Sequence, residues 1–275
     1  MAWYAGYSGN RLWYEERGAG TPIVFIHGWC MSSAVWRLQL EGLPDSFRVI
    51  VIDLPGHGNS PAHAGGFHIK GCAADLAGLF ESLQLHDALL AGWSLGSLIA
   101  LESFARLREK LSGLVLIAGT PRFTRGDDFP YGLSRIEVDG MNRKVQRSLR
   151  RALEGFTARM FAQGELDDPS LAATVHGLLS NVPIPTVEVA LQALVTLAES
   201  DLRGRLALID LPTLIMSGDC DVICLPQASE YLAQRISSSR RVIFAGCGHA
   251  PFLTQSIRFN RCLDEFRGMV SGRAH

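Results

Sequence analysis

The segment Gly92-Trp93-Ser94-Leu95-Gly96 places one serine between two glycines. A Gly-x-Ser-x-Gly motif is short and often arises by chance, so its surroundings must decide its meaning. Here it directly follows the apolar run 88–92 and directly precedes the helix-like run 95–110. A tight turn between a strand and a helix exposes the serine oxygen, and glycines avoid collisions within that turn. Ser94 is therefore our candidate nucleophile, with an ordinary helix start as the alternative.

A serine hydroxyl is a weak nucleophile unless a base takes its proton. His249 is the candidate base because it lies in a glycine-rich loop just after the last predicted strand. Such a histidine needs a carboxylate that fixes its tautomer and stabilises its charged form. Asp219 and Asp221 both follow the strand predicted over 212–217. The predicted catalytic set is Ser94, His249 and one of these two aspartates.

Acyl transfer also needs hydrogen-bond donors for the oxyanion that forms in the transition state. The backbone N–H of Leu95, directly after the nucleophile, is one predicted donor. The other is the N–H of Trp29, in a loop where Gly28 allows close approach of the backbone. A simple turn at this point is the alternative. A serine at position 94, rather than an aspartate, argues against hydrolases that use a carboxylate nucleophile.

These residues must be positioned by a regular scaffold, and the chain alternates short apolar runs with longer helix-like stretches. Six continuous apolar runs are predicted as strands, at 21–27, 47–53, 87–92, 114–118, 212–217 and 241–245. The helices are predicted near 33–43, 68–84, 95–110, 227–237 and 254–268. This alternation predicts an α/β fold with a mainly parallel central sheet and helices on both faces. An antiparallel hairpin around Ser8-Gly9-Asn10 is expected at the sheet edge.

The alternation stops between about 121 and 205, where we find no strand-like run. We interpret this stretch as a helical lid inserted over the edge of the sheet where its parallel strands end, because open parallel sheets bind ligands there. Residues 1–120 and 206–275 would then form the α/β core, and residues 121–205 the lid.

A basic helix is predicted within this lid. If residues 141–160 form one helix, one of its faces carries Arg143, Lys144, Arg147, Arg150 and Arg151. The opposite face carries Val145, Leu149, Leu153, Phe156 and Met160. The basic face is either a docking surface or an ordinary solvated face.

The overall composition excludes several classes of function. The chain has 26 Lys and Arg residues against 27 Asp and Glu residues, which gives no support to a nucleic-acid or membrane-surface role. We find no apolar run as long as a membrane span, and the first residues do not resemble a secretory signal. The 6 cysteines are scattered without the spacing of a zinc site. We expect a cytoplasmic protein with no metal or other cofactor.

These motifs together resemble the α/β-hydrolase superfamily over nearly the whole chain, including the chain order Ser, Asp, His. Within it, the chain most resembles the family of pimeloyl-[acyl-carrier protein] methyl ester esterases of biotin synthesis. The early segments that carry this resemblance are His27-Gly28-Trp29, Val35-Trp36-Arg37, residues 53–60 and residues 92–96. The late ones are residues 182–185, Asp201-Leu202-Arg203, residues 211–218, Pro226 and residues 248–252.

The resemblance implies the carboxyl partner, the substrate and its contacts. The spacing Gly218-x-x-Asp221, which α/β-hydrolases share, favours Asp221 over Asp219 as the acid. The substrate would be a methyl ester of a pimeloyl chain attached to an acyl-carrier protein. The acyl chain would contact Trp29, Met160, Phe161 and Gln163. The acidic carrier would dock on Arg143, Arg147, Arg151 and Arg159.

The chain departs from this family's pattern at two points. Ser97 stands where a third glycine is common, and Cys224-Leu225-Pro226 replaces the usual Val-Pro after the acid. These departures bear on the predicted substrate more than on the predicted catalytic residues. The alternatives are a broad carboxylesterase or carbon–carbon bond hydrolase of free small molecules, and a ligand-binding protein that keeps the fold without turnover.

Overall fold

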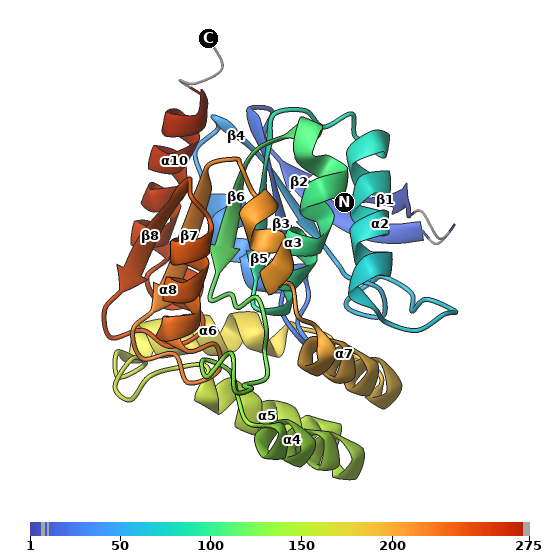
Figure 1. Ribbon diagram of the computed structural model, residues 1–275, viewed down its shortest axis with the longest axis vertical. Helices are drawn as coiled ribbons and strands as arrows, with labels where there is room; N and C mark the ends of the chain where they lie inside the picture. The colour runs from blue at the N-terminus through green and yellow to red at the C-terminus, as the bar shows by residue number, and fades with distance from the viewer. Residues whose placement is uncertain (7–8, 10, 272–275) are drawn as a thin grey trace.

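The computed structural model describes residues 1–6, 9 and 11–271, and within them eight strands form one sheet in the order β1-β2-β4-β3-β5-β6-β7-β8 (Figure 1). The strands are β1 Ala2–Ala5, β2 Arg11–Arg17, β3 Thr21–Ile26, β4 Phe47–Ile52, β5 Ala88–Trp93, β6 Leu111–Ile117, β7 Thr213–Gly218 and β8 Ser239–Phe244. Strands β3 to β8 run parallel, and β1 and β2 are antiparallel to their neighbours. The predicted, mainly parallel sheet is therefore confirmed.

The edge hairpin is also present, since Ala2 lies opposite Tyr14 and Ala5 lies opposite Arg11. Ser8 and Asn10, which were expected at its turn, lie outside the described residues.

Helices cover the sheet on both faces, as the continuous apolar runs require. The core helices are η1 Ser33–Trp36, α1 Arg37–Gly42, α2 Ile69–Ser82, α3 Leu95–Leu107, η2 Arg108–Lys110, α8 Pro226–Arg235, α9 Pro251–Thr254 and α10 Ser256–Ser271. Helix α2 packs against α3, and α1 packs against α10. Strand β5 is buried at every position, so both of its faces are covered. Within the described residues, no helix has the length and apolar character needed to cross a membrane.

Helices also fill the stretch between β6 and β7. They are α4 Arg135–Arg147, α5 Leu149–Arg159, α6 Pro169–Ser180 and α7 Val187–Glu199, followed by η3 Arg203–Leu208. Figure 1 shows α4 to α7 together beyond one end of the sheet. The N–H of Leu202 donates to the carbonyl of Pro121 at 2.8 Å, so the two ends of the insertion meet.

The expected single helix over 141–160 is wrong, because the chain breaks at Ser148. This residue adopts an extended conformation, with φ −166° and ψ 100°. Its hydroxyl accepts from the N–H of Arg151, so Ser148 ends α4 and caps α5. The basic residues are consequently divided between two helices. Arg143, Lys144 and Arg147 lie on α4, and Arg150 and Arg151 lie on α5; all five are exposed.

Arg203 links the two ends of the lid. Its guanidinium donates to Asp201 at 2.7 Å and to Asp128 at 2.8 Å. It also lies over the ring of Phe129, 5.5 Å from the centroid. The hydrogen bond from Arg203 lowers the pKa of both carboxyl groups below the usual 3.8. The Asp-Leu-Arg motif thus has a structural role at the base of the lid.

We predict that Arg203→Gln lowers the melting temperature at neutral pH by about 2–4 °C, since partly exposed ion pairs contribute little. Because the folded protein holds these carboxyl pKa values low, their contribution is present above pH 4 or so and is lost as pH falls through the lowered values. The difference in melting temperature between the variant and the wild type should therefore become smaller at acidic pH. Thermal unfolding at several pH values measures this difference, and the variant Arg135→Gln is the control. A deficit that is constant down to pH 2 would contradict this account.

Candidate active site

Ser94 lies at the sharp turn between β5 and α3, in the strained conformation φ 55°, ψ −114°. Only glycines fit on either side of it. A Cβ at Gly92 would overlap the carbonyl of Gly96, and a Cβ at Gly96 would overlap the carbonyl of Ile26. The N–H of Ser94 donates to the carbonyl of Ile117 at 2.9 Å. The turn is thus fixed by backbone packing and by a hydrogen bond to the end of β6.

Asp221 and His249 form a buried pair beside this turn. Asp221 Oδ2 lies 2.7 Å from His249 Nδ1. Its other oxygen accepts from the N–H groups of Ile223 at 2.8 Å and Cys224 at 3.0 Å. A carboxylate held in this way accepts a hydrogen bond from the N–H at Nδ1, so the proton stays on Nδ1 and the lone pair of the neutral His249 ring is on Nε2. That Nε2 is buried, and it has no hydrogen-bond partner among the described residues.

The alternative acid, Asp219, has a different position. It is exposed, and its Oδ1 accepts from the N–H of Gly246 at 2.8 Å. It therefore shapes the turn that leads toward the histidine loop. Of the two aspartates, the structure brings only Asp221 to His249.

Two further residues contact this set, and the motifs did not identify them as functional. Trp93 donates its indole N–H to the carbonyl of His249 at 2.9 Å, and the two rings lie 5.5 Å apart. Cys224 contacts the set through its backbone N–H, which donates to Asp221 at 3.0 Å. Burial raises the pKa of Cys224 well above its usual value, so the thiol stays protonated. In the sequence, Cys224 was visible only as a departure from the common Val-Pro.

The predicted oxyanion donors lie at the start of α3, for Leu95, and in the loop after β3, for Trp29. A Cβ at Gly28 would lie 3.4 Å from the Cβ of Ser94, so this loop approaches the nucleophile closely. The loop turns back on itself, because Met31 N–H donates to Gly28 at 3.2 Å. The indole of Trp29 is fixed to the lid by its 2.9 Å hydrogen bond to Ala190. Among the described residues, no hydrogen bond occupies the backbone N–H of Trp29 or Leu95.

Two buried histidines form hydrogen bonds with backbone groups of the loops near Ser94. His27 Nε2 accepts from the N–H of Leu54 at 3.0 Å, so its Nδ1 donates to the carbonyl of Gly28. His57 Nδ1 donates to the carbonyl of Pro55 at 3.0 Å. Burial lowers the pKa of His27 to about 4 and that of His57 to about 3. Both rings are neutral near pH 7, and neither contacts Ser94 through the hydrogen bonds described here.

Ser94 opens into a small pocket between the core and the lid, with a volume of about 40 Å³. Its walls are mainly apolar and comprise Trp29, Phe123, Leu133, Val138, Met141, Phe156, Leu194, Leu197 and Ile223. Its charged residues are Glu137 and Arg159. Arg159 also donates to the carbonyl of Val222 at 3.4 Å. The helical insertion therefore covers Ser94 in this structure.

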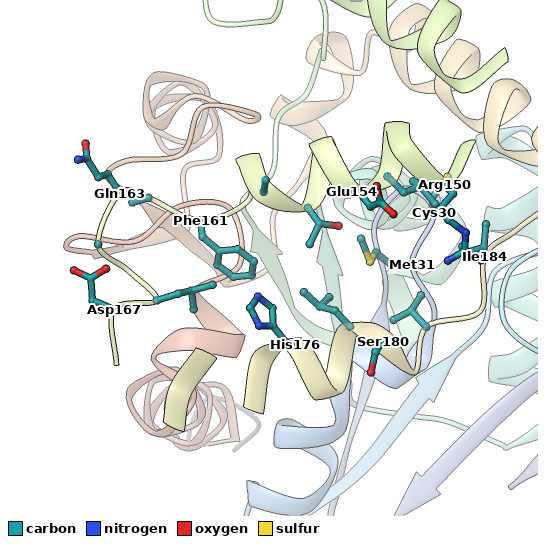
Figure 2. A pocket seen from close by; sticks show the side chains of 18 residues that line it. Cys30, Met31, Arg150, Glu154, Phe161, Gln163, Asp167, His176, Ser180 and Ile184 are labelled. Carbon is teal, nitrogen blue, oxygen red and sulfur yellow. The ribbon is translucent and has the colours of Figure 1, made fainter. Parts of the chain in front are cut away.

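The residues expected to contact an acyl chain are not all in this pocket. Trp29 lines it, but Phe161 and Gln163 line a separate cleft of about 720 Å³ between α5 and α6. Figure 2 shows Phe161 pointing into this cleft, with Gln163 at its outer end. Met160 is fully buried, and its carbonyl accepts from the N–H of His249 at 2.6 Å. The structure thus separates Phe161 and Gln163 from the Ser94 pocket.

The residues expected to dock a carrier are exposed on the lid. Arg143 and Arg147 lie on α4, and Arg151 and Arg159 lie on α5. Within the described part of the chain, none of the four forms an ion pair. Arg159 also belongs to the Ser94 pocket, so it connects the pocket with the lid surface. The same described residues contain no group of three or more His, Cys, Asp or Glu arranged to hold a metal ion.

The chain is similar to known hydrolases over almost its full length. It is 32% identical to the pimeloyl-[acyl-carrier protein] methyl ester esterase of Nitrosomonas europaea, over 91% of this chain and 97% of that protein. An esterase structure from Exiguobacterium antarcticum has a TM-score of 0.89 at 28% identity, covering 97% of this chain and 99% of that one. A bromoperoxidase structure from Bacillus anthracis has a TM-score of 0.87 at 25% identity, covering 96% and 98%.

The family described as alpha/beta hydrolase fold matches residues 21–256. This range includes the turn at Ser94, the pair Asp221 and His249, and the whole helical insertion. The resemblance noted from the motifs is confirmed, and the chain belongs to the α/β-hydrolase family.

Proposed function

We propose that the chain is a serine carboxylesterase that hydrolyses the methyl ester of pimeloyl-[acyl-carrier protein] in biotin synthesis, in the cytoplasm. The observation that carries the proposal is a nucleophile that opens into an apolar pocket with an arginine at the lid surface. The relative from Nitrosomonas europaea, which bears the name of this activity, supports it. A carrier protein would be the partner, and no cofactor is needed.

The proposed reaction begins when His249 Nε2 takes the hydroxyl proton of Ser94, whose oxygen attacks the ester carbonyl. The carbonyl oxygen becomes an oxyanion, and the N–H groups of Trp29 and Leu95 donate to it. Asp221 stabilises the imidazolium through Nδ1. The proton passes from Nε2 to the leaving methoxide, and methanol departs from the acyl-enzyme. Water, deprotonated by His249, then releases the carboxylate and restores Ser94.

The apolar walls of the pocket suit the methylene chain of such a substrate, and at about 40 Å³ the pocket would admit the whole chain only after the lid helices move apart. Each methylene group transferred from water to an apolar wall contributes about 0.8 kcal/mol. The walls from Phe123, Phe156 and Leu197 supply this surface, whereas the charged pair Glu137 and Arg159 offers polar contacts. We assign the methylene chain to the apolar side and the connection to the carrier to the side of Arg159.

A carrier surface is proposed on the lid helices. The exposed residues Arg143, Arg147 and Arg151 present positive charge without partner carboxylates in the described part of the chain. Unpaired charges of one sign attract an oppositely charged partner and speed its association. An acidic acyl-carrier protein has the complementary charge.

A broad esterase acting on free small esters is the second candidate. The small volume of the Ser94 pocket favours it, since about 40 Å³ admits only a short acyl group without movement of the lid. The likeness to the Exiguobacterium esterase structure is also compatible with it. A ligand-binding protein without turnover is less well supported, because the strained Ser94 and the buried Asp221–His249 pair are costly to maintain without chemistry.

The serine mechanism predicts that Ser94→Ala loses hydrolysis of p-nitrophenyl esters by about 10⁴- to 10⁶-fold. The fold should be retained, since the substitution removes only a hydroxyl. Initial rates and a melting curve for both proteins measure these effects. Equal turnover by the variant and the wild type would rule out Ser94 as the nucleophile.

The specific role predicts growth without biotin. Expression of the wild-type chain should rescue a biotin-requiring bacterial strain that lacks its methyl ester esterase, and Ser94→Ala should not. Immunoblots establish that both proteins are present at equal levels. No rescue by well-expressed, esterase-active wild type would favour the broad esterase instead.

The carrier surface predicts a selective effect of charge reversal. Arg147→Glu with Arg151→Glu should raise KM for the carrier-bound methyl ester about tenfold or more, because attraction becomes repulsion at the docking face. Small p-nitrophenyl esters should be hydrolysed as before. Lys70→Glu with Arg261→Glu, on exposed positions of α2 and α10, is the matched control. An equal loss on both kinds of substrate would contradict carrier docking here.

A further inference from the structure

We propose that Glu165 is a positioning residue for the catalytic base, holding the loop that carries His249 against the lid. The proposal rests on the Ser94–His249 mechanism proposed above, but it does not depend on the carrier-bound substrate. Glu165 lies in the lid segment between α5 and α6, far along the chain from the loop that it contacts.

The Glu165 carboxylate makes three hydrogen bonds. Its Oε2 accepts from the N–H of Ala162 at 2.7 Å, within its own segment. The same oxygen accepts from the N–H of Gly248 at 2.7 Å, one residue before the histidine. Its Oε1 accepts from the hydroxyl of Thr254 at 2.6 Å, in the helix that follows the loop. One lid carboxylate therefore holds the histidine loop on both sides.

The backbone of the same lid segment also contacts the loop. The carbonyl of Met160 accepts from the N–H of His249 at 2.6 Å. A Cβ at Gly248 would overlap that carbonyl, so the close approach requires a glycine there. The two consecutive N–H groups before and at the histidine thus both donate to the lid.

These contacts determine where Nε2 of His249 lies. The imidazole is held by Asp221 through Nδ1, and the histidine carbonyl accepts from Trp93. Neither bond fixes the backbone N–H side of the residue, which Glu165 and Met160 hold. Hydrogen bonds to an ionised carboxylate are stronger than those between neutral groups. Loss of the Glu165 charge should therefore let the loop shift, and misplacement by about 1 Å is enough to reduce catalysis severely.

Two other groups lie at this loop, the Cys247 thiol and the exposed Asp219 carboxylate, which accepts from the N–H of Gly246 at 2.8 Å. The thiol of Cys247 accepts from the amide of Gln255 at 2.9 Å and lies 3.6 Å from the hydroxyl of Thr254. Burial raises the pKa of Cys247 to about 12, so it remains neutral at working pH. Glu165 does not line the Ser94 pocket, and it can act on the reaction only through the loop.

The test compares Glu165→Gln with the wild type on p-nitrophenyl acetate, below the melting temperature of both. We expect kcat to fall about 10- to 100-fold, with KM changed less than about twofold, because the base is misplaced and the pocket is intact. The rate at which a fluorophosphonate modifies Ser94 should fall by a similar factor. Asp167→Asn is the matched control, since Asp167 is an exposed carboxylate on the same segment (Figure 2).

A second pair of variants keeps the proposal testable if Glu165→Gln does not fold. Thr254→Val removes one of the three hydrogen bonds and should lower kcat by a smaller factor, whereas Thr254→Ser keeps the hydroxyl and should restore it. A reduced melting temperature with unchanged kcat and unchanged fluorophosphonate reactivity would show a purely structural role and overturn the proposal. Failure to rescue biotin growth, with the kcat effects present, would refute only the carrier-bound substrate.

Discussion

The backbone at Ser94 is the constraint on which the rest of the site depends. Its conformation, φ 55° and ψ −114°, is rare for a residue with a side chain and costs about 1–3 kcal/mol. The packing of β3, β5 and β6 offsets this cost, because the carbonyl of Ile117 accepts from the N–H of Ser94 and the carbonyl of Ile26 lies close against Gly96. Neither Gly92 nor Gly96 can gain a side chain without opening the turn. The packing of the parallel sheet thus keeps Ser94 at the wall of the pocket.

The position of the base depends on two separate parts of the chain. The acid loop after β7 holds the imidazole through Asp221, and the lid holds the backbone of His249 through Met160. The lid also fixes the indole of Trp29 through the carbonyl of Ala190. It therefore does more than cover Ser94, since it contacts the backbone of the proposed base and the indole in the proposed oxyanion loop. An electrostatic site held in advance avoids reorganisation during the reaction.

The features that could be predicted from the sequence are those with a local signal. The apolar runs and the glycines around Ser94 identified the sheet and the turn, because their periodicity and spacing reflect local geometry. The break at Ser148 was missed, since one serine within an amphipathic stretch of suitable length does not reveal whether it caps a helix. Glu165 was missed because a carboxylate that accepts from a backbone N–H group 83 residues away leaves no motif. The positions of Phe161 and Gln163 in another cleft were missed for a similar reason, because the spacing of residues in the sequence does not show how the lid packs.

The closed lid limits how any substrate can reach Ser94. An opening at residues 160–165 would separate Met160 and Glu165 from the histidine loop and displace the base. An opening at α4 would leave the histidine loop in place, because α4 has no hydrogen bond to that loop among those described. Helix α4 supplies Val138 and Met141 to the pocket. The exposed Arg143 and Arg147 lie on this same helix. A partner that binds α4 would thus act on a wall of the pocket that has no described hydrogen bond to the histidine loop.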